Sequence, residues 1–106
     1  MSENIEKLVD SALEGVSGGM TRDLRAAYAC IQGYYGNGQD RIIALRRAGY
    51  DPDTVQYLVN ALINYEGVAK DVINGKYGNG QERITRLTKA GYPAAIVQDL
   101  VNNMLW

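Results

Sequence analysis

The heptapeptide YGNGQDR at residues 35–41 returns as YGNGQER at residues 77–83, forty-two positions later in the chain. Shifting the sequence by that interval aligns residues 26–64 with residues 68–106, and nineteen of the thirty-nine aligned positions are identical. Identity of this extent indicates an internal duplication, so we interpret the chain as two tandem copies of one unit. A unit of about forty residues is near the lower limit for independent folding, which predicts that the two copies pack on each other or that the N-terminal helix packs across them.

Each copy has the pattern of three short helices, and no stretch shows the strict alternation of a strand. In the first copy we expect helices at about 22–32, at about 40–48, and from residue 52 onward. Thr21 and Asp51 stand where N-cap residues belong, because each side chain can accept a hydrogen bond from a free backbone N–H. The glycines expected to end helices with a positive φ are Gly33, Gly49, Gly75 and Gly91.

The chain before the first copy has an amphipathic pattern of its own. Residues 1–20 carry apolar side chains at helical spacing, and the SGG at 17–19 is typical of a break. On the third helix of the first copy, the residues expected on one apolar face are Val55, Leu58, Val59, Leu62 and Ile63. We therefore predict an all-α protein: an N-terminal amphipathic helix within 1–20, followed by tandem three-helix bundle repeats at 21–64 and 65–106.

Composition narrows the class of protein. The 106 residues are 46% hydrophobic and 22% charged, which is typical of a globular protein. Eleven Lys and Arg nearly balance twelve Asp and Glu, so the basic excess needed for nucleic-acid binding is missing. No apolar run reaches the ~20 residues of a membrane-spanning helix, and the N-terminus lacks the pattern of a secretory signal. We expect a protein made in the cytoplasm, with neither nucleic acid nor membrane as its partner.

The side chains of most catalytic and metal sites are also scarce. The chain has no His, and Cys30 is its one cysteine. Val72 occupies the position equivalent to Cys30 in the second copy, so a buried structural role is favoured for that thiol. The GNG corner lacks both the Lys-Ser/Thr of a phosphate loop and a preceding strand. Acidic residues lie at helix starts, where they complement the helix dipole. These observations predict a protein that is not an enzyme and that uses no metal or cofactor.

The stretch VAKDVINGKYGNGQERITRLTKAGYPAAIVQDLVN at 68–102 closely resembles the Cpl-7-like cell-wall-binding repeat family, also called CW_7. The shared motifs are GNG, an acid-Arg pair, RL, AGY and VQxxVN, and residues 33–60 carry a looser version of them. This resemblance implies a three-helix bundle that binds bacterial peptidoglycan, recognising the disaccharide and the start of its peptide stem. Such repeats usually stand in tandem beside a catalytic domain in phage endolysins and bacterial wall hydrolases.

Both copies gather the same polar side chains around the GNG corner. A Tyr ring offers apolar area to a sugar, Asn and Gln amides suit hydroxyl and N-acetyl groups, and Arg offers forked donors to a carboxylate. The second copy also has Arg86, where the first has Ala44. The predicted ligand-binding residues are Tyr35, Asn37, Gln39 and Arg41 in the first copy, and Tyr77, Asn79, Gln81, Arg83 and Arg86 in the second.

Structural roles compete with binding at several positions. The corner asparagines can cap the following helix, Gln56 and Gln98 can tie the corner, and Tyr50 and Tyr92 suit packing. The favoured function is a non-catalytic module that binds disaccharide-peptide fragments of peptidoglycan at the bacterial cell wall, encoded by a phage or a bacterium and accessory to a wall hydrolase. The alternative is a small intracellular helical interaction protein, with a protein partner or a second copy of itself as its ligand.

Overall fold

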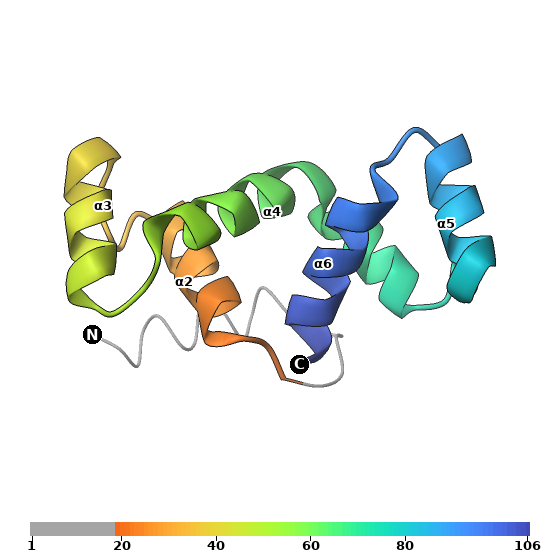
Figure 1. The fold of residues 1–106 in the computed structure, drawn as a ribbon, viewed down its shortest axis with the longest axis horizontal. Helices are drawn as coiled ribbons and strands as arrows, with labels where there is room; N and C mark the ends of the chain where they lie inside the picture. Colours follow the sequence, from red (N-terminus) through yellow and green to blue (C-terminus); the bar gives the residue numbers. More distant parts are fainter. Residues whose placement is uncertain (1–18) are drawn as a thin grey trace.

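The computed structural model describes residues 19–106, and this range contains five α-helices and no strand (Figure 1). The all-α class is therefore confirmed. The N-terminal amphipathic helix was predicted within residues 1–20, of which 1–18 lie outside the described residues. The helices are α2 (Arg22–Ile31), α3 (Gly38–Arg47), α4 (Pro52–Ile73), α5 (Gly80–Lys89) and α6 (Ala94–Leu105).

Local capping signals set most of the helix ends where the sequence predicts them. Thr21 is the N-cap of α2, and its hydroxyl accepts a hydrogen bond from the Leu24 backbone N–H at 3.1 Å. Asp51 caps α4 in the same way, with Pro52 at the first helical position. Gly75 follows α4 with a φ of 91°, a left-handed conformation that glycine adopts without steric cost. These N-caps and this glycine confirm the predicted helix starts and stop.

The main difference from the predicted fold is α4, which continues for 22 residues through the predicted boundary at 64 and 65. It joins the third helix of the first repeat to the first helix of the second. The position that Thr21 holds in the first copy is occupied by Ile63 in the second, and an isoleucine cannot cap a helix. The chain therefore continues as a helix. The division into units at 21–64 and 65–106 remains a prediction.

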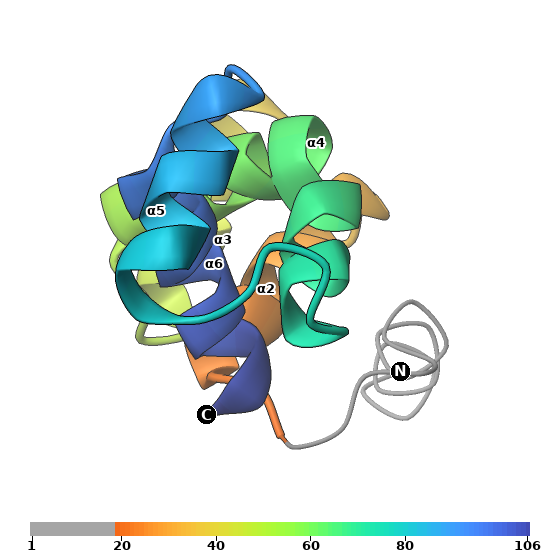
Figure 2. The same ribbon diagram turned by 90° about the vertical axis from the view of Figure 1, so that its right-hand side faces the viewer.

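The two repeats share one hydrophobic core, organised around α4. Both α2 and α6 pack against this helix, which runs along the length of the molecule in Figure 1. At the two ends of the molecule, α3 and α5 each contribute a single buried residue, Leu45 and Leu87 respectively. Cys30 is buried in the same core, as predicted. Figure 2, an end-on view, shows α5 beside α6.

Hydrogen bonds between side chains also connect the two repeats. They run from Thr21 to Asn103 at 2.5 Å, from Tyr28 to Glu66 at 2.5 Å, and from Tyr57 to Asp99 at 2.9 Å. The backbone N–H of Thr21 also donates to the Asn103 carbonyl at 3.0 Å. Together with the continuous core, these bonds confirm that the two copies pack on each other.

One residue of the predicted apolar face lies in solvent instead. The Ile63 side chain is 68% exposed, whereas Val55, Leu58, Val59 and Leu62 are buried. The prediction for Ile63 was wrong because this residue lies at the margin of the stripe that the other four form around the helix axis. Within residues 19–106, none of the helices combines the length and the apolar composition that crossing a membrane requires.

Candidate functional site

The GNG corners place an arginine in the same geometry in both repeats. Each corner joins the helix before it to α3 or α5, and its first glycine has a positive φ of 79° at Gly36 and 71° at Gly78. The Nε of Arg41 donates to the Gly36 carbonyl at 3.2 Å, and the Nε of Arg83 donates to the Gly78 carbonyl at the same distance. The corner therefore orients the guanidinium from one side.

A glutamine from the following helix orients the same guanidinium from a second side. In the second repeat, Nη1 of Arg83 donates to Oε1 of Gln98 at 2.9 Å, and Nε2 of Gln98 donates to Oδ1 of Asn102 at 2.9 Å. This is the role of a corner tie that the sequence suggested for Gln98. The result is a polar chain that runs from the GNG corner to the exposed face of α6.

The first repeat contains an equivalent chain. Nη1 of Arg41 donates to Oε1 of Gln56 at 3.3 Å, and Nε2 of Gln56 donates to Oδ1 of Asn60 at 3.1 Å. A guanidinium has five N–H groups, and these contacts use two of them. Among the described residues, no carboxylate forms an ion pair with Arg41 or Arg83. Each repeat thus holds one guanidinium in a fixed position, with three N–H groups that these contacts do not use.

A groove of about 450 Å³ lies between α5 and α6 beside this charge. Its volume falls in the ~300–1,000 Å³ range of small-molecule sites. Arg83 and Gln98 supply its polar groups, and most of its remaining surface is apolar. Its lining residues are Gly80, Arg83, Ile84, Leu87, Ala94, Ala95 and Gln98. The first repeat has Pro52 and Asp53 at the positions of the two alanines, so the corresponding surface there is bulkier and acidic.

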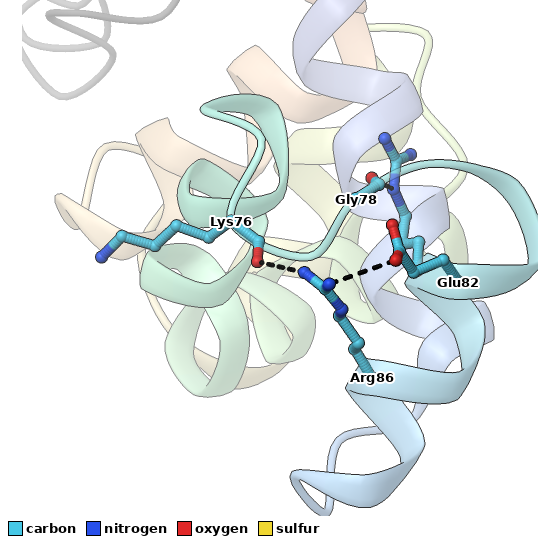
Figure 3. A network of polar contacts seen from close by, with 5 residues as sticks. Lys76, Gly78, Glu82 and Arg86 are labelled. Carbon is cyan, nitrogen blue, oxygen red and sulfur yellow. Dashed lines mark hydrogen bonds and ion pairs between the residues drawn. The ribbon is translucent and has the colours of Figure 1, made fainter.

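Arg86 lies beside the corner but is held by protein groups. Figure 3 shows its guanidinium between the Glu82 carboxylate and the Lys76 carbonyl, at 3.1 Å and 3.4 Å respectively. The Lys76 ammonium in turn lies 3.5 Å from the Asp71 carboxylate. Arg86 on α5 thus holds the corner through the Lys76 carbonyl, and Glu82 balances its charge. Ala44 at the equivalent position cannot form these contacts in the first repeat.

The corner tyrosines pack against the hydrophobic core. Tyr35 and Tyr77 are both half-buried. The Tyr35 ring meets the rings of Tyr34 and Tyr50 edge to face, with centroids 4.9 Å and 6.3 Å apart. Tyr50 has a packing role, as predicted, and the Arg22 guanidinium lies 4.2 Å from its ring centroid. Much of each corner tyrosine is therefore committed to the fold, which leaves a ring edge and the hydroxyl for a ligand.

The corner amides remain exposed. Asn37 and Asn79 occupy the N-cap positions of α3 and α5, each with φ −128° and ψ 157°. Neither side chain forms the capping hydrogen bond that was considered for it, so the capping interpretation is correct for the backbone and wrong for the side chain. Gln39 and Gln81 are exposed in the first turns of these helices. All four amides can hydrogen-bond a ligand at the corner.

Burial of Tyr35 predicts a loss of stability in alkaline solution. Burial, followed by the neighbouring Tyr50, Tyr34 and Cys30, raises the pKa of Tyr35 from the ordinary value near 10 to about 12. The neutral form is thus favoured in the folded state, so the stabilisation is complete below pH 10 and is lost as the pH rises to about 12. Denaturant unfolding across this range should show a smaller loss for Tyr35→Phe than for the native chain. An equal loss would contradict this account.

The structure brings together only part of the predicted ligand set. Arg83 lines the groove, the corner amides lie nearby, and Arg86 and Tyr77 are engaged by the protein. Sequence reasoning did not assign the groove surface formed by Ile84, Ala94 and Ala95. The identical VQxxVN motif in both copies was the available signal for Gln98. Within the described residues, no group of three His, Cys, Asp or Glu side chains is placed to hold a metal ion.

Comparison with known proteins gives the family. No curated protein matches the chain. The model of the CW_7 repeat matches it twice, at residues 25–63 and 66–105, and both matches contain a GNG corner with its Arg–Gln pair. The two matches span most of the chain and agree with the two copies seen in the sequence. The chain therefore belongs to the CW_7 repeat family, a non-catalytic family of cell-wall-binding repeats.

Proposed function

We propose that this chain binds disaccharide-peptide fragments of bacterial peptidoglycan through one site in each repeat and catalyses no reaction. The single observation that carries the proposal is the fixed guanidinium of Arg83. It is held by Gly78 and Gln98, lacks a carboxylate partner among the described residues, and borders an apolar groove. A binding site built in this way favours a ligand that is part anionic and part apolar.

The chemistry of a muropeptide fits these groups. The remaining N–H donors of Arg83 suit a carboxylate or carbonyl of the lactyl-peptide stem, because the guanidinium fork can form paired hydrogen bonds. The methyl groups of an N-acetyl group and of a stem alanine suit the apolar wall formed by Ile84, Ala94 and Ala95. Asn79 and Gln81, which are exposed at the corner, suit sugar hydroxyls. Tyr77 contributes the rim of its ring.

The duplication supports a polymeric ligand. Because Arg41 is held as Arg83 is, one glycan network can engage both repeats, and a second binding event on the same polymer raises the overall affinity. We further propose that the chain is encoded by a phage or a bacterium and acts at the bacterial cell wall as an accessory to a wall hydrolase. This setting follows the usual context of the family.

The test is cosedimentation of the native chain with purified, protein-free sacculi. We expect the protein to pellet with intact sacculi, and a soluble disaccharide-dipeptide to compete it back into the supernatant. Chitin particles are the matched control, because they present N-acetylated sugars without lactyl or peptide groups. Retention on sacculi should exceed retention on chitin, since only sacculi offer the carboxylates and peptide carbonyls that suit Arg83.

Two outcomes would contradict the proposal. Failure to pellet with sacculi at low salt would exclude wall binding and favour the intracellular alternative, a protein partner. Pelleting that salt abolishes and the soluble fragment does not inhibit would indicate charge attraction alone, because the screening of exposed charges does not depend on ligand shape.

A further inference from the structure

A second groove lies at the junction of the two repeats, beside the arginine site of the first repeat. Its volume is about 260 Å³. One wall is a face of α4, whose residues have the spacing i, i+3, i+4, i+7 and i+8 that brings side chains together on a helix. Its lining residues are Tyr57, Asn60, Ala61, Asn64 and Tyr65 on α4 and Ile96 on α6. Two aromatic rings and two amides on α4 thus line the groove opposite Ile96 of α6.

The side chains of this junction groove are held in place before any ligand arrives. The Tyr57 hydroxyl donates to the Asp99 carboxylate at 2.9 Å, across the repeat boundary. The Tyr65 ring meets the Tyr92 ring edge to face, with centroids 6.3 Å apart. Ala61, which is buried, adds no bulk to the groove. A rigid surface of this kind loses little conformational entropy on binding.

The groove is connected to the arginine site of the first repeat. Asn60 lines the groove, and its Oδ1 accepts the hydrogen bond from Gln56, which in turn accepts one from Arg41. Nδ2 of Asn64 donates to the Asn60 backbone carbonyl at 2.8 Å. These contacts leave Nδ2 of Asn60 and Oδ1 of Asn64 for a ligand. The groove therefore offers one amide donor and one amide acceptor next to the Arg41 site.

A single repeat cannot form this groove. In the second repeat, the positions of Tyr57, Asn60, Ala61 and Asn64 are held by Asp99, Asn102, Asn103 and Trp106. The tyrosine at position 57 and the small alanine at position 61 are both replaced there. The groove exists because α4 continues from one repeat into the next and α6 packs against it.

We propose that the junction groove binds one neutral N-acetylated hexose of a glycan strand whose neighbouring unit occupies the Arg41 site. Aromatic rings suit the C–H faces of a pyranose, and the paired amide groups suit an N-acetyl group. No side chain that lines the groove is charged, so it discriminates in favour of sugar over the peptide stem. Its volume lies just below the ~300–1,000 Å³ range of drug-sized sites, which fits one sugar ring. The inference rests on the proposed wall binding.

The test is a titration of the native chain with triacetylchitotriose, followed by NMR. This probe has N-acetylated sugar rings and lacks the lactyl and peptide groups that suit the arginine sites. We expect saturable shifts in the side-chain amide signals of Asn60 and Asn64. Asn64→Arg fills the groove and should weaken this binding by at least about fivefold, the effect of losing a hydrogen bond and the ring contact. Ile63→Arg adds the same charge to an adjacent, 68% exposed residue outside the groove and should have no effect.

The outcomes separate this inference from the proposed function. Equal weakening by Asn64→Arg and Ile63→Arg would overturn the groove assignment, because the effect would then follow charge and not position. Absence of shifts at Asn60 and Asn64 in a chain that still pellets with sacculi would overturn the groove alone. Saturable shifts at both amides in a chain that fails to pellet would support the groove and contradict wall binding.

Discussion

Replacing both Arg41 and Arg83 with Gln is expected to weaken binding to purified sacculi by at least about a hundredfold. Each guanidinium is held by a glycine carbonyl and a glutamine, with three N–H groups left for a ligand. A charge-assisted hydrogen bond contributes about 1.5–3 kcal/mol, which corresponds to roughly tenfold or more per site. Because the two sites act on one polymer, the losses multiply. Sedimentation with increasing amounts of sacculi measures the change.

The matched control for this variant is Arg46→Gln with Arg47→Gln. These two arginines lie exposed in the last turn of α3, so the control removes the same number of positive charges from outside the corners. We expect the control to bind sacculi almost as the native chain does. Equal weakening by both double variants would show that net charge governs binding. Thermal unfolding of each variant shows whether the corner still folds without its Arg–carbonyl bond.

Replacing Gly67 with Pro is expected to destabilise the protein by about 3 kcal/mol or more. Gly67 lies inside α4, six residues before its end at Ile73. A proline there removes a backbone N–H from the helix and clashes with the carbonyl one turn earlier. Since α2 and α6 both pack against α4, a break would disturb the packing of both repeats. Urea unfolding followed by circular dichroism measures the free energy of unfolding.

Replacing the same residue with Ala should act in the opposite direction. Gly67 is exposed, and an added Cβ meets no atom within 4 Å. Alanine in a helix interior is favoured over glycine by about 0.5–1 kcal/mol, so Gly67→Ala should stabilise the protein by that amount. If both variants changed the free energy of unfolding by less than about 0.5 kcal/mol, residue 67 would not lie inside a continuous helix.

The features that the sequence predicts correctly are those with a local physical cause. Thr21 and Asp51 start helices because a side-chain oxygen within three residues satisfies a free N–H. The continuity of α4 was not predicted, because it follows from the lack of an N-cap residue: Ile63 occupies in the second copy the position at which Thr21 caps the first. Alignment of the two copies placed a boundary there, because a repeated sequence suggests a repeated break.

The candidate site was predictable in composition and not in geometry. Identity between the copies marked Arg83 and Gln98 as members of the unit, but fifteen residues separate them and only the crossing of α5 and α6 brings them together. Arg86 matched the expected chemistry equally well, yet Glu82 one turn earlier on α5 balances its charge. The groove depends on the small size of Ala94 and Ala95, which has meaning only once α6 is placed against α5.

The unbroken α4 makes the spacing between the two arginine sites a fixed length. Domains joined by a flexible tether can adapt to many separations, and their effective concentration changes gradually with distance. Here a continuous helix joins the repeats, so the two arginine sites stay at a fixed separation. We expect a glycan whose binding units match this separation to occupy both sites at little further entropic cost, and a glycan that does not match it to occupy one site. The duplication would then select polymers by their periodicity as well as by their chemistry.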